Sequence, residues 1–269
     1  SSLTAQQGLR VYISADMEGV AGLSAMNDPL GRRLMTAEVN AAIAGAFDAG
    51  ATRVAVNDAH GGHNNLLQDQ LDPRATLLRG DLKPYGMMQG LDSSFSAVVF
   101  VGYHAKAGSR NGFLAHTGSG RTADLRVNGM SVGEGGMNAL FAAWYGVPVV
   151  FVSGDSLAVE QMRDLIPDIG GASVKTGIWN RAVWTLSPDS AQAAIRRGVT
   201  AALRGRPGRQ LAAIPPFRVE LRYTSGLYAD IAEGIPSVDR VDATTVGFTV
   251  DRYPAAYRMI RVLYKHLSQ

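Results

Sequence analysis

The chain contains no cysteine among its 269 residues. That absence excludes a disulfide scaffold and a cysteine nucleophile, and it leaves the redox compartment undetermined. The sequence also lacks any apolar run approaching the roughly 18 residues that would suggest a membrane span. Because no thiol is available, a hydrolytic zinc or a similar ion would have to be bound by imidazole and carboxylate ligands.

A strong excess of either charge is also missing. The formal net charge is +3, and the basic residues are scattered except for a short arginine-rich stretch at 204–209. A nucleic-acid-binding protein would cluster its basic residues, so we expect no nucleic-acid partner. The first ten residues lack the charged and apolar regions of a signal peptide. We therefore expect a cytoplasmic protein with no membrane partner.

Buried-looking strands alternate with helical patterns along most of the chain. Apolar residues make up 46% of the sequence and charged residues 18%, which suits a folded protein with a substantial core. Continuous apolar strands that alternate with helices predict an α/β fold: a mostly parallel sheet covered by helices in a three-layer, Rossmann-like arrangement. The expected strands are 9–16, 52–58, 96–104 and 147–155, and the expected helices are 32–50, 137–146 and 189–204.

A proline- and glycine-containing segment near residue 210 marks a candidate boundary. The helix expected at 189–204 ends in GRPGR, and Pro215-Pro216 follows soon after. We expect a metal-binding α/β catalytic domain over residues 1–210 and a smaller α+β domain over 211–269. The expected elements of the smaller domain are a strictly alternating, half-exposed strand at 217–224, a helix at 226–233, a strand at 244–250 and a terminal helix at 254–267.

Two shorter segments complete this assignment. Asn128-Gly129 separates two short strands and suits the type I′ turn of a hairpin. The polar, proline-containing stretch 71–86 is assigned no strand.

Histidines and carboxylates gather where the predicted strands end. Four of the five histidines fall within residues 60–116. Asp16 and Glu18 follow the first strand, His60 follows the second, and His104 closes the third. In an open α/β sheet, ligands bind beyond the carboxyl ends of the strands. Glu134 lies among glycines at the start of a helix, where the backbone can approach an ion closely. We therefore expect these five side chains to converge on a metal site.

The number of candidate ligands favours two ions over one. A catalytic zinc usually takes about three protein ligands and keeps a position for water. Five ligands are too many for one such site. If one carboxylate bridges, however, five residues supply three ligands to each of two ions, as in binuclear hydrolases.

Each residue also has a simpler explanation. Asp16 and Glu18 can cap the turn that follows them, and His60 can be a solvated loop residue. His104 can be a core histidine whose ring nitrogens form hydrogen bonds within the protein. His63 is expected to be structural or exposed. Convergence of the group on one edge of one sheet is what favours the metal site.

The motifs of the chain, taken in order, resemble one known family. VYISADMEGVAG, VNDAHGGHNNL, VGYHAKAG, HTGSG, VNGMSVGEGGMNA and VKTGI look like the corresponding segments of the zinc-dependent D-aminopeptidases of the dipeptide-transport-operon type. The resemblance runs from about residue 10 to the C-terminus. It implies two zinc ions per subunit and the release of an N-terminal D-amino acid or glycine from short peptides. It also implies a homodecamer of two stacked pentameric rings whose active sites face an inner cavity.

The same resemblance implies roles for individual residues. Asp16, Glu18, His60, His104 and Glu134 correspond to the ligands of the two zinc ions, and His116 corresponds to the catalytic histidine. His116 can act as a nucleophile, as an acid/base or as an oxyanion donor, and the sequence leaves that choice open. Lys175 and Asp155 can meet a substrate terminus, although a solvated lysine and a helix cap are the expected roles.

Three functions remain as hypotheses. A binuclear zinc aminopeptidase is the leading one, and a two-metal hydrolase of another amide or a phosphoester is the alternative. The third is a peptide-binding protein that carries a structural ion. Against this hypothesis, a sealed structural site does not need five ligands together with His116. A dinucleotide-binding dehydrogenase is excluded because no GxGxxG follows the first strand.

Overall fold

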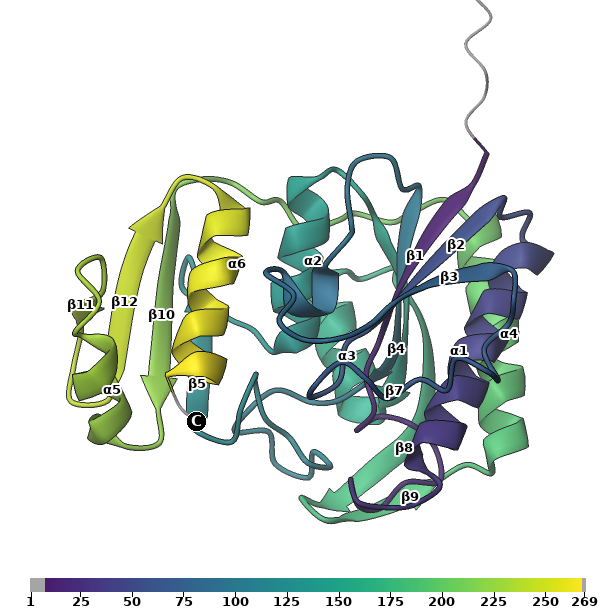
Figure 1. The fold of residues 1–269 in the computed structure, drawn as a ribbon, viewed down its shortest axis with the longest axis horizontal. Helices are drawn as coiled ribbons and strands as arrows, with labels where there is room; N and C mark the ends of the chain where they lie inside the picture. The colour runs from purple at the N-terminus through teal and green to yellow at the C-terminus, as the bar shows by residue number, and fades with distance from the viewer. Residues whose placement is uncertain (1–7, 268–269) are drawn as a thin grey trace, which may run out of the picture.

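The computed structural model describes residues 8–267. A seven-stranded sheet forms its centre, in the order β3-β2-β1-β4-β7-β8-β9 (Figure 1). Neighbouring strands are parallel, except that β9 runs antiparallel to β8 at one edge. The strands are β1 Arg10–Ala15, β2 Arg53–Asp58, β3 Ala75–Leu78, β4 Ala97–Tyr103, β7 Val149–Asp155, β8 Gly170–Trp179 and β9 Ala182–Thr185.

Helices cover both faces of this sheet and bury its central strands. α1 (Gly31–Asp48) and α4 (Pro188–Arg204) lie on one face, and α2 (Glu134–Trp144) and α3 (Ser156–Leu165) lie on the other (Figure 1). Successive side chains of a strand point to opposite faces. In β1, accordingly, Ile13 joins the core under α1 and α4, whereas Tyr12 joins the core on the opposite side. The expected three-layer α/β fold is confirmed.

A smaller antiparallel sheet lies beside this unit, in the order β11-β12-β10-β5-β6. Its strands are β5 Thr122–Val127, β6 Met130–Ser131, β10 Phe217–Tyr223, β11 Asp239–Arg240 and β12 Thr245–Val250. α5 (Gly226–Ala232) packs against it, and α6 (Tyr253–Arg261) lies between it and α2 (Figure 1). The hydroxyl groups of Tyr253 and Tyr257 donate hydrogen bonds to Met137 O and Asn138 Oδ1 of α2, at 2.9 and 2.6 Å.

The smaller sheet takes strands from both sides of residue 210. β5 and β6 come from the middle of the chain, and β10 hydrogen-bonds to β5 with Leu221 opposite Leu125. The smaller sheet therefore contains strands from before and after residue 210. The division of the chain into two domains at that residue stays a prediction. The predicted hairpin is present, with φ of 50° at Asn128 and 80° at Gly129, as a type I′ turn requires.

The sequence-based assignment missed several elements. β3 lies within the stretch 71–86 to which no strand was assigned, and α3, β8, β9 and β11 were also not predicted. β3 is a four-residue edge strand with alternating intermediate and exposed side chains, so it carries no run of buried residues. Within the described part of the chain, every helix is too short or too polar to cross a lipid bilayer.

Candidate metal centre

The carboxyl ends of three adjacent parallel strands carry the first candidate ligands. In the sheet register Ala15 of β1 lies between Asp58 of β2 and Val101 of β4. Asp16 therefore emerges at the centre of this edge, where its backbone N–H donates to Val101 O at 2.8 Å. A Cβ at Gly102, whose φ is +74°, would collide with the Asp16 carbonyl oxygen, so the close approach of the two segments requires glycine.

His60 is held against these carboxylates by the loop after β2. The buried Asp58 carboxylate accepts hydrogen bonds from the backbone N–H groups of Asn65 and Leu66, at 2.5 and 2.8 Å, and so closes the loop. The Nδ1 atom of His60 then lies 2.9 Å from Glu18 Oε2 and 3.3 Å from Asp16 Oδ1. Asp16, Glu18 and His60 thus form one set of three ligand atoms that a single ion can share.

His104 and Glu134 complete a second set. His104 Nδ1 donates to the Ala105 carbonyl oxygen at 3.0 Å, which directs Nε2 toward Asp16 Oδ2 at 3.4 Å and Glu134 Oε2 at 3.3 Å. Glu134 is the first residue of α2, and its Oε1 accepts a 2.6 Å hydrogen bond from Gly118 N. Asp16, His104 and Glu134 therefore form another set of three.

Both sets share Asp16 and use different oxygens of its carboxylate. Oδ1 faces His60 and Oδ2 faces His104, so each set has its own oxygen of the Asp16 carboxylate. A further set joins Glu18, His104 and His116. It requires the Nε2 atom that His104 presents to Asp16 and Glu134, so it is an alternative to the second set rather than a third site.

Two buried atoms at the centre of the cluster test whether a cation fits there. Within residues 8–267, His104 Nε2 and Asp16 Oδ2 have no hydrogen-bond partner. Because Nδ1 donates to Ala105, Nε2 is the ring nitrogen that would present a lone pair to an ion, with the ion taking the place of the proton on Nε2. Buried polar atoms without partners are rare, and two facing acceptors are stabilised by a cation between them. The donor set therefore fits zinc or a similar divalent ion.

The electrostatics of the cluster agree with that fit. Burial and the neighbouring carboxylate of Glu18 raise the pKa of Asp16 to about 7. Burial alone would lower the pKa values of His60 and His104, but the surrounding carboxylates outweigh it and raise them to about 11 and about 10. Burial would raise the pKa of Glu134, yet the charge of His104 lowers it to about 2. Three carboxylates buried together thus require positive charge nearby.

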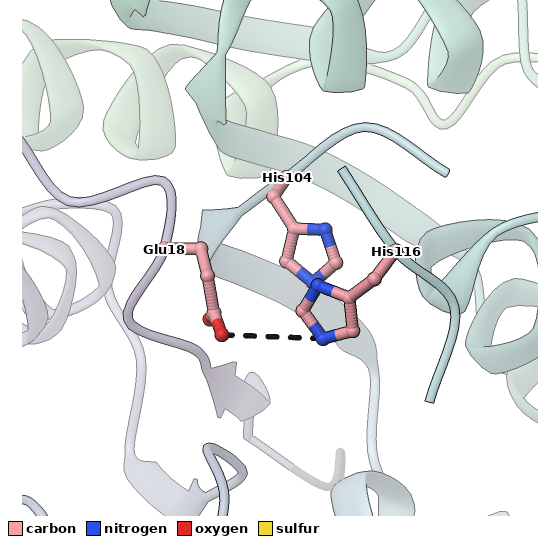
Figure 2. A group of neighbouring side chains, drawn as sticks. All are labelled: Glu18, His104 and His116. Carbon is pink, nitrogen blue, oxygen red and sulfur yellow. Dashed lines mark ion pairs between the residues drawn. The ribbon is translucent and has the colours of Figure 1, made fainter. Parts of the chain in front are cut away.

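His116 lies beside the cluster and faces into a cavity. Its Nδ1 donates to the Leu114 carbonyl oxygen at 2.8 Å, and its Nε2 lies 3.5 Å from Glu134 Oε1 and 4.0 Å from Glu18 Oε1. Its ring stacks on that of His104, with centroids 4.1 Å apart (Figure 2). The side chain is 26% exposed, whereas that of His104 is 1% exposed. His116 is thus the more solvent-accessible histidine of the stacked pair.

The cavity in front of the cluster has a volume of about 130 Å³. The three carboxylates of the cluster, His60 and His116 form part of its wall. Residues from the loop after β2, from α6 and from the helical turn Val262–His266 that follows α6 form much of the rest. The residues that line it include Asp16, Glu18, His60, His116, Glu134, His63, Arg261 and Lys265. A small substrate in this cavity therefore lies against the candidate metal-binding side chains.

Lys175 corrects one expectation from the sequence. It was expected to be solvated, but it is 2% exposed, and its Nζ donates to the carbonyl oxygens of Glu18 and Leu23 at 2.8 and 2.9 Å. Lys175 therefore holds the loop that carries Glu18. Asp155 is the expected helix cap, since its side chain accepts a 3.1 Å hydrogen bond from Leu157 N at the start of α3. His63 is buried, which agrees with its expected structural role.

Replacing Lys175 with methionine is expected to lower the free energy of unfolding by about 1–3 kcal/mol, because two buried carbonyl groups lose their donor. The exposed Arg181 lies in the turn after β8, and Arg181→Met is the matched control, with an expected change below about 0.5 kcal/mol. Urea denaturation of the three proteins measures the difference. Equal stability of the Lys175 variant and the parent protein would show that Lys175 does not hold the loop.

Comparison with known proteins identifies the family. Residues 9–262 match the Peptidase M55 family, described as D-aminopeptidase. A D-aminopeptidase of Bacillus subtilis (strain 168) is 36% identical over 266 residues, covering 95% of this chain and 96% of the relative. The chain belongs to the M55 D-aminopeptidase family. The solved Zn-dependent D-aminopeptidase DppA of Bacillus subtilis, a self-compartmentalizing protease, matches with a TM-score of 0.94 and 34% identity over 97% of this chain and 98% of that chain.

Membership of the M55 family confirms the resemblance stated from the motifs and the predicted enzyme class, a metallo-aminopeptidase. The structure brings all six predicted site residues into one cluster. Five of them line the cavity, and His104 lies behind them with a side chain that is 1% exposed. Arg261 and Lys265 also line it but were not among the predicted residues. No spacing marks them, because only the docking of α6 brings residue 261 beside residue 16. Gly118, which hydrogen-bonds to Glu134, lies in the HTGSG motif and could have been singled out there.

Proposed function

We propose that the protein is a binuclear zinc aminopeptidase that releases an N-terminal D-amino acid or glycine from short peptides. The observation that carries the proposal is the pair of three-ligand sets that share Asp16. The names of the Bacillus relatives support zinc and a D-configured substrate. Neither relative's name points to a phosphoester or to another amide, so that alternative has no specific support.

The residues of the chain supply complementary parts of the reaction. Divalent cations held at this site would supply polarisation of a peptide carbonyl and activation of a water molecule. Asp16, Glu18 and Glu134 would offset their charge, and His60 and His104 would provide nitrogen ligands. His116 keeps its proton on Nδ1 through Leu114, so the lone pair of Nε2 faces the cavity. We propose that Nε2 accepts a proton from the attacking water and passes it to the departing amine.

Metal analysis combined with matched substrates tests the proposal. The purified protein is expected to bind two equivalents of zinc per chain and to hydrolyse D-alanyl peptides at least about 10-fold faster than L-alanyl peptides. A tenfold ratio corresponds to about 1.4 kcal/mol of difference between the two transition states. Removal of zinc with a chelator is expected to abolish hydrolysis, and its return is expected to restore it. The control substrate is a chromogenic phosphate ester, which should not be cleaved.

Two outcomes would contradict the proposal. Full activity of protein that contains less than one zinc per chain would exclude a binuclear mechanism. Cleavage of the phosphate ester without cleavage of any alanyl peptide would establish the alternative hydrolase.

We also propose that the protein forms a homo-oligomer. The Bacillus DppA is a self-compartmentalizing protease. In this chain, the hairpin formed by β8 and β9 extends from the edge of the large sheet (Figure 1) and carries Trp179, which is 66% exposed, and Trp184, which is 73% exposed. Large exposed apolar groups mark interaction surfaces. The arrangement as two pentameric rings and the cytoplasmic location stay predictions.

Replacing Trp179 and Trp184 together with serine is expected to reduce the assembly to a smaller species, because two large apolar side chains leave the contact. Light scattering after gel filtration measures the mass. Leu227→Ser, which removes a 60% exposed apolar side chain from α5, is the control and should leave the mass unchanged. An unchanged mass for the double variant would place the interface elsewhere.

A further inference from the structure

Arg261 is a buried positive charge whose guanidinium lacks a full set of partners. It is the last residue of α6 and is 3% exposed. In the part of the chain that the structure describes, Nη2 is buried and has no hydrogen-bond partner. Burial of a charged group without a partner is strongly unfavourable. A group kept in this state is a candidate for binding an anion from outside the chain.

The guanidinium has a defined position at the wall of the metal-centre cavity. Arg261 lines this cavity together with Asp16, Glu18 and Glu134. Its Nη1 occupies the space that a side chain at position 86 would fill, and Gly86, whose φ is +37°, leaves that space open. The cavity therefore has a carboxylate-rich metal-binding wall and, separately, a guanidinium on its lining.

The other basic groups of this wall already have partners or are neutral. Lys265 Nζ donates to Gly61 O at 2.9 Å and lies 3.4 Å from Asp81 Oδ2. Burial and the charges of Lys83, Lys265 and Arg261 lower the pKa of His63 to about 2, so its imidazole is neutral. Within residues 8–267, the Nδ1 atom of His63 and the Nη2 atom of Arg261 are both buried without a partner. Of these two groups, Arg261 is the one that carries a positive charge.

We propose that Arg261 binds the free C-terminal carboxylate of a short peptide whose amino end lies at the metal centre. The inference rests on the proposed aminopeptidase function and adds that the enzyme selects peptides by their free carboxylate. Guanidinium and carboxylate match in geometry and charge. Arg261 lines the same cavity as the metal-binding residues, so one short peptide can meet both.

A comparison of D-alanyl-D-alanine with its C-terminal amide tests the inference on the zinc-loaded protein. The unmodified protein is expected to have a kcat/KM at least about 10-fold higher for the free acid, with the difference mainly in KM. In Arg261→Gln, the kcat/KM for the free acid is expected to fall about 100-fold and the acid-to-amide ratio to approach one. Arg258→Gln removes an exposed arginine one turn earlier on α6 and should keep the ratio.

A binding measurement separates this inference from the proposed function. Calorimetry with a non-hydrolysable dipeptide analogue, in which CH₂–NH replaces the peptide bond, should show the same acid-over-amide preference in the unmodified protein. Equal affinity for the acid and amide analogues would overturn the role of Arg261, whether or not the protein hydrolyses peptides. Preferential binding of the acid together with no hydrolysis of either substrate would instead support the role of Arg261 and contradict the proposed function. Neither result depends on how well the Arg261 variant folds.

Discussion

Asp16→Asn is expected to lower kcat/KM by about 10⁴-fold and to reduce the zinc content from two equivalents per chain to less than one. Asp16 belongs to both three-ligand sets, with one oxygen facing His60 and the other facing His104. An amide in its place has no charge and offers one oxygen, so neither set keeps its shared anion. Without bound ions, the polarisation of the peptide carbonyl and the activation of water are both lost.

The zinc content of the Glu18→Gln variant can be compared with that of Asp16→Asn. Glu18 joins His60 in the first set but is absent from the set of Asp16, His104 and Glu134. Its replacement should therefore remove one equivalent of zinc and keep the other. Asp69→Asn alters an exposed carboxylate and serves as the control, with unchanged zinc content and activity. Elemental analysis measures the zinc content, and initial rates measure the activity. Equal zinc loss in the Asp16 and Glu18 variants would contradict a carboxylate shared by the two sets.

His116→Ala is expected to lower kcat by about 10²- to 10⁴-fold, the usual contribution of a general acid or base, while the zinc content stays at the level of the unmodified protein. The expectation follows from geometry. His116 Nε2 faces the cavity, and the five residues of the two compatible ligand sets do not include it. Added imidazole should restore part of the rate, because the variant keeps a cavity where the ring was.

Three measured outcomes separate the roles of His116. Unchanged turnover would remove it from the reaction. Loss of zinc together with turnover would favour the alternative ligand set of Glu18, His104 and His116. A bell-shaped pH profile that loses one limb in the variant would assign that limb to the imidazole.

The sequence allowed the principal elements and four of the candidate site residues to be predicted for one physical reason, whereas Glu134 was singled out by its glycine-rich helix start and His116 by the family resemblance. Strands buried on both faces have continuous apolar runs, and parallel strands place their carboxyl ends at the same edge. Asp16, His60 and His104 follow three such runs, and the structure places their side chains within one cluster. The type I′ turn at Asn128-Gly129 was predictable because few residues tolerate two successive positive φ angles.

Other features depend on tertiary contacts that no local pattern records. Lys175 carries the same charge as an exposed lysine, and only the position of β8 beside the Glu18 loop buries it. The pairing of β5 with β10 joins segments that are far apart in the chain, so the smaller sheet could not be inferred from the order of its elements. The position of Arg261 beside the cavity follows from the docking of α6 against α2 in the same way.

The cavity wall combines residues that are about 245 positions apart in the sequence. Asp16 follows β1, whereas Arg261 ends α6 and Lys265 lies in the helical turn after it. During biosynthesis, residues 253–265 emerge from the ribosome after every strand and all the ligand residues. A nascent chain can therefore form the edge of the large sheet but lacks the wall that encloses a substrate. The complete pocket arises only after residues 253–265 have emerged and docked, which makes hydrolytic competence depend on this late segment.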